Sequence, residues 1–428
     1  MLLIYVTKSS TRLQYICQFI FKELLGLSYS LTIDGEGFKT HDGPKINYSD
    51  LNFEKPVITL RPHSLLFETG INTQRIQCLK KGDDKIFFST PGSDFAFDIF
   101  AASFYLISRY EEYLPHKLDI YDRYAHENSI AYQEGFLNVP LVNKWVLGFA
   151  NFLKKCFPDL RFQFTTGKFI ATYDIDMAWS YKRKGLLKNL GGFFKAPSAQ
   201  RIKVLLGMDK DPFDSYDFLD KLHSENNLEP IYFFLVADKR SLYDKNILPT
   251  HPLMAKLIKD HAHNYKTGLH PSWKSNDSYS TLTAEKKILE TITGLQINSS
   301  RQHYIKFRLP TTFENLLAAG ILDDYSMGYG SINGFRASVA SSFYWYNLPE
   351  EKITPLRIHP FCYMDANSFY EEKLNVTEAF EEMRYYFREC KLVNGNFISI
   401  FHNNFLGTDK KFRGWKEAYE KFISQAQL

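Results

Sequence analysis

Short apolar runs alternate with amphipathic stretches along most of the chain, and this alternation is typical of an α/β protein. Apolar runs of about four to eight residues predict buried strands, and apolar residues at every third or fourth position predict helices. Because strands that alternate with helices usually pair in parallel, we predict a mainly parallel sheet in the second half of the chain. The strands expected there are residues 169–175, 231–238, 266–270, 303–310, 355–361 and 397–403, with helices such as 252–262 and 284–295 between them.

The first part of the chain has the same alternation on a smaller scale. A long apolar helix is predicted over residues 97–114 and an amphipathic helix over 142–157. Pro158 ends the second helix, and a turn-prone run follows it. We therefore expect a smaller α/β domain over residues 1–160 and a larger α/β domain over 165–428.

Two carboxylates stand one residue apart where the first predicted strand of the larger domain ends. Strand residues alternate between faces, so Asp174 and Asp176 project on the same side, a few Å apart. Like charges at that distance raise the pKa of one carboxyl unless a cation or a hydrogen-bond donor offsets the repulsion. A bound metal ion would do so, and so would a sheet end that is open to water.

Polar or ionisable residues recur where other predicted strands end. They are Asp238, His270, Arg308 and His402. In a barrel of parallel strands, catalytic groups gather at the carboxyl ends of the strands. The recurrence therefore favours a functional site that includes Asp174 and Asp176.

Composition and charge narrow the classes of partner. The net charge of +4 comes without a dense basic face, which argues against nucleic acid, and the basic stretch 181–188 is expected to be a solvated loop. Five scattered cysteines without Cys-x-x-Cys spacing argue against a disulfide framework. We find neither a signal-peptide pattern nor an apolar run of about 20 residues, so we expect a cytoplasmic protein without a membrane span. The charged segment 109–113 is expected to be structural.

The order of motifs over residues 165–406 resembles the polysaccharide deacetylase superfamily (carbohydrate esterase family 4). The resemblance extends to a divergent branch with an uncharacterised N-terminal domain. It implies an irregular (β/α) barrel preceded by the smaller α/β domain. It also implies a hydrolase that removes N- or O-linked acetyl groups from a saccharide with a bound divalent metal, for which zinc is the expected ion.

The resemblance assigns roles residue by residue. "TYDID" resembles the first family motif, T-F-D-D-G, which implies that Asp174 is the general base and that Asp176 is a metal ligand. "GLHPSW" places His270 at the first metal histidine. "FRLPTT" resembles F-R-P-P-Y-G and gives Arg308 the role of holding the base carboxylate. "ISIFHNN" resembles the closing L-x-H motif and makes His402 the candidate acid.

One motif departs from the family pattern. Four residues after His270, where the family has its second metal histidine, the chain has Lys274, and a protonated amine is a poor metal ligand. Catalytic zinc normally has three protein ligands and water. His303 is the nearest replacement, but strict alternation along a strand over 303–310 would place it on the opposite face from Arg308.

Three alternatives to the hydrolase stay open. Because Lys274 stands in place of the second metal histidine, the chain could also be a non-catalytic carbohydrate-binding or polysaccharide-assembly protein on a degenerate barrel. A glycosyltransferase could use the D-x-D pair with a metal and a nucleotide sugar, although His270 and His402 would then have no role. A phosphatase of the haloacid dehalogenase type also begins with strand–D-x-D, but it needs Thr or Val where Ala178 stands.

Overall fold

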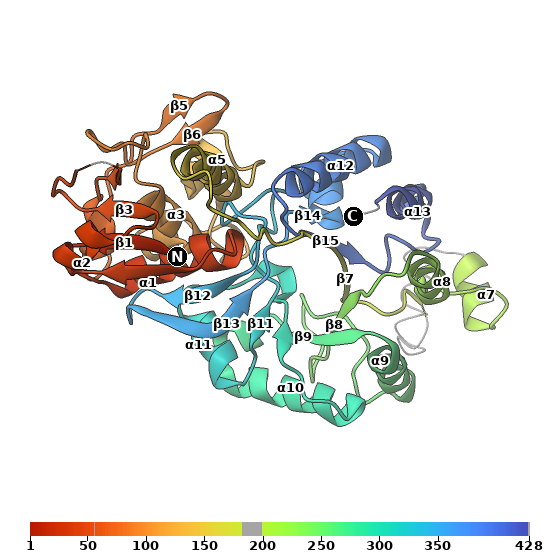
Figure 1. Cartoon of the computed structure of the whole chain (residues 1–428). Coiled ribbons are helices and arrows are strands. Elements are labelled where there is room, and N and C mark those ends of the chain that lie inside the picture. The colour runs from red at the N-terminus through yellow and green to blue at the C-terminus, as the bar shows by residue number, and fades with distance from the viewer. Residues whose placement is uncertain (55, 182–198, 427–428) are drawn as a thin grey trace.

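Two parallel sheets organise the chain, one in each half (Figure 1). The computed structural model describes residues 1–54, 56–181 and 199–426. The basic stretch predicted as a loop, apart from its first residue, lies outside the described residues. Within the described part, no helix is long and apolar enough to cross a membrane.

The N-terminal sheet has four parallel strands in the order β2-β1-β3-β4. The strands are β1 (Leu2–Val6), β2 (Tyr29–Thr32), β3 (Lys45–Tyr48) and β4 (Ile58–Leu60), and a separate hairpin pairs β5 (Leu79–Lys81) with β6 (Asp84–Ile86). The helices are α1 (Thr11–Cys17), α2 (Gly35–Thr40), α3 (Ile99–Ile107), α4 (Ile130–Gln133) and α5 (Leu141–Cys156). Asp98 begins α3 by accepting hydrogen bonds from two backbone N–H groups, and every residue of α3 is buried, as the apolar pattern predicts.

The second sheet has nine strands in the order β12-β13-β11-β10-β9-β8-β7-β15-β14. All neighbours pair in parallel except β12 and β13. The strands are β7 (Phe169–Ile175), β8 (Ile231–Leu235), β9 (Lys266–His270), β10 (Ser299–Ser300), β11 (Asp323–Asp324), β12 (Phe343–Asn347), β13 (Lys352–Ile358), β14 (Tyr363–Met364) and β15 (Phe397–His402). The helices are α7 (Ala199–Leu205), α8 (Tyr216–Asn226), α9 (Pro252–Asn264), α10 (Tyr279–Thr293), α11 (Thr311–Ala318), α12 (Val376–Leu392) and α13 (Trp415–Gln425).

The mixed α/β architecture is confirmed, but the described residues do not show a closed barrel. Among the described residues β12 and β14 are the two edge strands, and no hydrogen-bonded pairing joins them. The two central neighbours of β7 are the buried strands β8 and β15, and their carboxyl ends lie at the same edge. The sheet therefore still gathers strand ends in one place, which a parallel sheet does without closing.

The prediction of a strand over residues 303–310 is wrong. A 3₁₀ turn covers His303–Ile305, and Tyr304 and Ile305 have left-handed backbone angles, with φ of 59° and 54°. Neither angle is compatible with an extended strand. The alternation argument that set His303 and Arg308 on opposite faces therefore does not apply.

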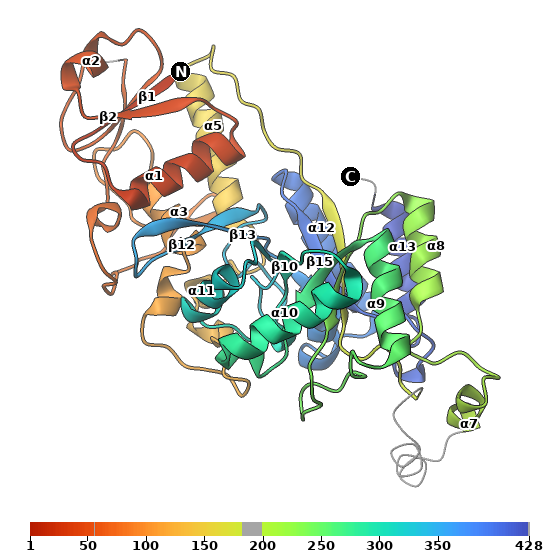
Figure 2. The same cartoon turned by 90° about the horizontal axis from the view of Figure 1, so that it is seen from below.

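The two halves share one hydrophobic core. Figure 2 shows α1 and α3 beside β12 and β13, and the ring of Tyr346 on β12 lies 5.2 Å from the rings of both Tyr15 and Phe104. On α5, the Asn143 amide donates to the Ser341 hydroxyl at 2.9 Å. Buried apolar residues from the first strand to the last helix form a single cluster. The predicted boundary at residues 158–167 thus lies between two sheets that are joined by a continuous core.

A buried ion network also joins the halves. Glu112 accepts a hydrogen bond from Arg109 Nε at 2.7 Å and another from Arg336 Nη2 at 2.6 Å, and all three side chains are buried. Burial alone would raise the pKa of Glu112, but the two guanidinium groups outweigh it and lower the pKa to about 2. The charged segment 109–113 therefore makes structural contacts, as expected, although these contacts lie in the interior and not at a solvent-exposed helix end.

Candidate metal centre

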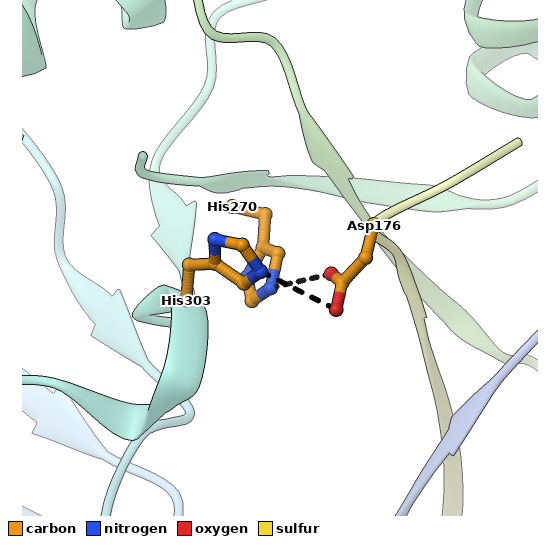
Figure 3. A group of neighbouring side chains, drawn as sticks. All are labelled: Asp176, His270 and His303. Carbon is orange, nitrogen blue, oxygen red and sulfur yellow. Dashed lines mark ion pairs between the residues drawn. The ribbon is translucent and has the colours of Figure 1, made fainter. Parts of the chain in front are cut away.

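Three imidazoles converge on one carboxylate at the carboxyl ends of the central strands. Asp176 follows β7 by one residue, and its Oδ1 lies 3.0 Å from His270 Nε2. Its Oδ2 lies 3.4 Å from His303 Nε2 and 3.5 Å from His402 Nε2. Figure 3 shows the rings of His270 and His303 turned toward the Asp176 carboxylate. The ends of β7, β9 and β15 and the turn at His303 thus meet at a single point.

The hydrogen bonds of His270 fix which of its nitrogens faces the carboxylate. Nδ1 lies 2.5 Å from the backbone carbonyl oxygen of Arg301. A carbonyl oxygen only accepts, so Nδ1 carries a proton and donates it. In a neutral ring Nε2 then presents its lone pair to Asp176 Oδ1. Two acceptors at 3.0 Å repel each other unless a proton or a cation lies between them.

The other two histidines are oriented by carboxylates. His303 Nδ1 lies 3.0 Å from Asp244 Oδ1, and Asp244 is itself fixed by the backbone N–H of Trp273 at 3.0 Å. Burial lowers the pKa of His303, but Asp176 and Asp244 outweigh it and raise the pKa to about 9. The negative charge around His303 thus strongly favours a positive charge at this point.

His402 is held by a buried aspartate from the neighbouring strand end. Its Nδ1 lies 2.7 Å from Asp365 Oδ1, and its backbone N–H donates to Asp365 Oδ2, also at 2.7 Å. Burial lowers the pKa of His402, but Asp365 and the other aspartates outweigh it and raise the pKa to about 10. His402 is therefore suited to carry and donate a proton from Nε2.

The donor set fits a divalent metal ion. One ligand atom each of Asp176, His270 and His303 lie within 4.8 Å of one another. Within the part of the chain that the structure describes, the buried Oδ1 of Asp176 accepts no hydrogen bond. Two imidazoles and a carboxylate that leave room for water are a donor set typical of catalytic zinc. Each histidine also has an acceptor on Nδ1, as metal-ligating imidazoles do.

Asp174 has a buried arginine partner. Arg301 Nη1 lies 3.0 Å from Asp174 Oδ1 and 2.7 Å from the Thr172 hydroxyl oxygen, and the guanidinium stacks on Phe233 at 4.5 Å from the ring centre. Arg301 is fully buried. The other oxygen of Asp174 lies 3.9 Å from His270 Nε2 and faces the metal ligands. A charged partner on one oxygen leaves the second free to accept a proton.

Arg308 is not at the site, which corrects the role expected for it. Its side chain is 47% exposed, and Nη2 lies 3.7 Å from Asp122. The turn at His303–Ile305 redirects the chain, so that Arg301, seven residues earlier, holds Asp174 instead. Lys274 is exposed and does not line the site, and neither does the exposed Asp238.

The structure thus brings together five of the six predicted residues: Asp174, Asp176, His270, His303 and His402. Sequence reasoning missed Arg301, Asp365 and Asp244. Arg301 directly follows β10 and Asp365 directly follows β14. The strand-end rule would have found both, but each strand is only two residues long: β10 has no apolar residue, whereas the apolar run of residues 361–364 directly precedes Asp365. Asp244 lies in the loop after β8, where no local pattern distinguishes it.

The five converging residues line a cavity of about 450 Å³. Asp174, Asp176, His270 and His402 line it from the carboxyl ends of β7, β9 and β15, while Met364 lines it from β14 and Phe405 from the segment after β15. Tyr121 and Arg123 come from the N-terminal half. The volume is within the range of pockets that hold small molecules.

Comparisons with known proteins give a family for the N-terminal part and distant similarities for the rest. Residues 2–158 match a family of unknown function, DUF7033. No curated protein matches the sequence.

Solved structures similar to the chain are polysaccharide deacetylases, at low identity. A Mycobacterium smegmatis protein described as a polysaccharide deacetylase has 14% identity and a TM-score of 0.40, covering 61% of this chain and 84% of that chain. A polysaccharide deacetylase from Bacillus cereus has 8% identity and a TM-score of 0.32, covering 61% of this chain and 88% of that chain. A mutant of a CE4-family pseudoenzyme has 9% identity and a TM-score of 0.31, covering 61% and 62%. At such low TM-scores these similarities add nothing to the geometric argument.

Proposed function

We propose that the chain is a metal-dependent hydrolase that removes N- or O-linked acetyl groups from a saccharide. The observation that carries the proposal is the convergence of Asp176, His270 and His303 beside a separately held carboxylate, Asp174. Each imidazole has its Nδ1 occupied, so that Nε2 points into the cavity. This division between a metal-ligand set and a base suits the metal-assisted hydrolysis of an acyl bond.

Asp176, His270 and His303 would hold the ion, and zinc is the proposed metal because the donors are nitrogen and oxygen. When bound, the ion would polarise the acyl carbonyl and lower the pKa of a water molecule. The third ligand, His303, takes the place of the histidine that the family motif has where this chain has Lys274.

The remaining residues manage protons. Asp174 would accept the proton of the attacking water at Oδ2, while Arg301 holds the carboxylate in place through a hydrogen bond to Oδ1. His402 would donate the proton on Nε2 to the leaving amine or alkoxide, and Asp365 holds the ring in that orientation. Both carboxylates and His402 line the same cavity, so one substrate can contact all of them.

Two aspartate variants test the proposal. Asp176→Asn should lose both bound zinc, measured by plasma mass spectrometry, and the hydrolysis of acetylated oligosaccharides. Asp174→Asn should retain zinc and lose hydrolysis by a factor of about 10²–10⁴, the usual contribution of a general base. Asp323→Asn is the matched control, because Asp323 is on β11 of the same sheet and pairs with His359 outside the cavity.

Unchanged zinc content in both variants would contradict the metallohydrolase and favour the non-catalytic carbohydrate-binding protein. A wild-type protein that binds zinc but hydrolyses no acetylated saccharide would contradict the enzymatic part alone.

A further inference from the structure

The N-terminal half contributes a wall of the cavity. Tyr121 and Arg123 line it, although they precede the large sheet by more than 40 residues of chain. The N-terminal half is therefore not structurally separate from the candidate site, because two of its side chains contact the same cavity as the candidate metal ligands. Both residues lie in a loop of residues 117–125, in which an isolated antiparallel β-bridge joins Leu118 to Tyr124.

Tyr121 lies in a cluster of aromatic rings at one side of the cavity. Its ring centre lies 5.3 Å from that of Tyr304 and 6.5 Å from that of Tyr243. Trp273 stacks on Tyr243 at 3.9 Å, with 16° between the ring planes, and supports the cluster from behind. The three tyrosines line the cavity, whereas Trp273 does not. These three side chains, Tyr121, Tyr243 and Tyr304, are called the tyrosine wall below.

The loop holds Tyr121 in place before any ligand arrives. The Asp119 carboxylate accepts hydrogen bonds from the backbone N–H groups of Tyr121 at 2.9 Å and Arg123 at 3.0 Å. The Arg123 side chain pairs with Asp119 at 2.7 Å and also donates to the Tyr304 carbonyl oxygen at 2.7 Å. Tyr121 and Tyr304 are therefore tied to each other through Arg123. A preset contact surface costs less entropy on binding than a mobile one.

The wall is next to the candidate metal ligands. The ring of Tyr304 lies 4.7 Å from the ring of His303, and both residues line the cavity, so a ligand on the wall reaches the candidate metal centre.

We propose that the tyrosine wall is a saccharide-binding subsite, on which a pyranose ring stacks its C–H face. A sugar ring has an apolar face and a polar edge, and the tyrosines offer matching apolar faces with hydroxyl groups at their edges. The N-terminal half, through Tyr121, would then select the sugar, while the large sheet supplies the chemistry. This inference rests on the proposed function for the identity of the ligand as a saccharide, but binding does not require turnover.

Binding measured without turnover tests the subsite. In the full-length zinc-loaded chain carrying Asp174→Asn, we would titrate oligosaccharides of acetylated glucosamine and of acetylated xylose by calorimetry. Adding Tyr121→Ala should weaken binding of the saccharide that the parent binds by about tenfold, the effect of losing one aromatic contact of about 1.4 kcal/mol. Tyr121→Phe should restore most of the affinity, because the ring face is kept, and it also shows that the loop still folds.

Tyr279→Ala is the matched control, since Tyr279 is exposed on α10 and its hydroxyl bonds to the Ala318 carbonyl, outside the cavity. Equal affinity in the Tyr121→Ala and control chains would overturn the subsite, as would a parent chain that binds neither saccharide. Hydrolysis by the wild-type chain is scored separately. If it fails while Tyr121→Ala still weakens binding, the proposed function falls and the subsite stands.

Discussion

At the scale of single residues, a buried guanidinium and an exposed one differ sharply in what they can do for Asp174. Arg301 is fully enclosed and contacts Asp174, Thr172 and the Phe233 ring, whereas Arg308 pairs with Asp122 in solvent. A charge-assisted hydrogen bond in the interior is stronger than an exposed ion pair, which is screened by water. The residue that holds Asp174, the proposed base, is therefore identified by its buried contact and not by its place in a motif.

We predict that Arg301→Gln lowers the turnover of an acetylated saccharide by about 10–100-fold, the usual cost of removing a group that orients a catalytic residue. Arg308→Ala should stay within about twofold of the wild type, because exposed ion pairs contribute little. Steady-state kinetics of the two variants would measure this, and Arg301→Lys would separate the loss of the fork from the loss of charge. A larger loss for Arg308→Ala than for Arg301→Gln would reverse the assignment.

The sequence predicts the site residues that obey a strand-end rule with a clear apolar run. Asp174, Asp176, His270 and His402 all end or follow strands of five residues or more. The sequence predicts His303 as the nearest replacement for the second metal histidine, but it predicts it on a strand over residues 303–310 that is replaced by a 3₁₀ turn. Nothing local predicts the left-handed angles of Tyr304 and Ile305, since both residue types favour strands. These angles are found where surrounding contacts determine the backbone.

At the scale of elements, two loops from different halves depend on each other. The 3₁₀ turn at His303–Ile305 presents the proposed metal ligand His303, and its Tyr304 carbonyl accepts a hydrogen bond from Arg123 in the loop of residues 117–125. Arg123 is buried, and Asp119 holds its guanidinium at 2.7 Å. The strained turn is thus supported by a side chain from the N-terminal half.

We predict that Arg123→Ala weakens zinc binding by about tenfold, because the turn that positions His303 loses its partner, as with other outer contacts of metal ligands. Competition with a chromophoric chelator would measure the zinc dissociation constant. Asp122→Asn is the control, since Asp122 is in the same loop and its carboxylate forms an exposed pair with Arg308. Equal zinc affinity for Arg123→Ala and the control would mean that the turn is stable by itself.

At the scale of the whole molecule, the two large sheets share one continuous hydrophobic core. The division expected at residues 158–167 lies between the end of α5 and the start of β7. It could not predict that Tyr15 and Phe104 pack on Tyr346, since contacts across more than 200 residues have no local signal. The same limit applies to closure of the large sheet, which depends on whether two edge strands meet.

We predict that the wild-type chain unfolds in a single cooperative transition in differential scanning calorimetry. A continuous core makes unfolding of either half expose apolar surface of the other, which couples the two. Two separated heat-capacity peaks, one of them insensitive to added zinc, would instead show two independent domains.

The buried network of Glu112 with Arg109 and Arg336 gives the whole molecule a pH dependence. The pKa of Glu112 is lowered to about 2 from an ordinary value of 4.5. A carboxyl whose pKa is lower in the folded state stabilises the fold fully above its unfolded pKa, and this contribution is lost as the pH falls through the window from 4.5 toward 2.

The wild-type free energy of unfolding, measured with urea, should therefore decline between pH 6 and pH 3 more steeply than that of Glu112→Gln. At pH 7 the variant should be less stable by about 3–5 kcal/mol, since two buried guanidinium groups lose a charged partner. Glu36→Gln serves as the control, because Glu36 is 83% exposed and pairs only with Lys39. Its curve should run parallel to the wild type, and a Glu112→Gln curve parallel to both would mean that the two halves are not held together by this network.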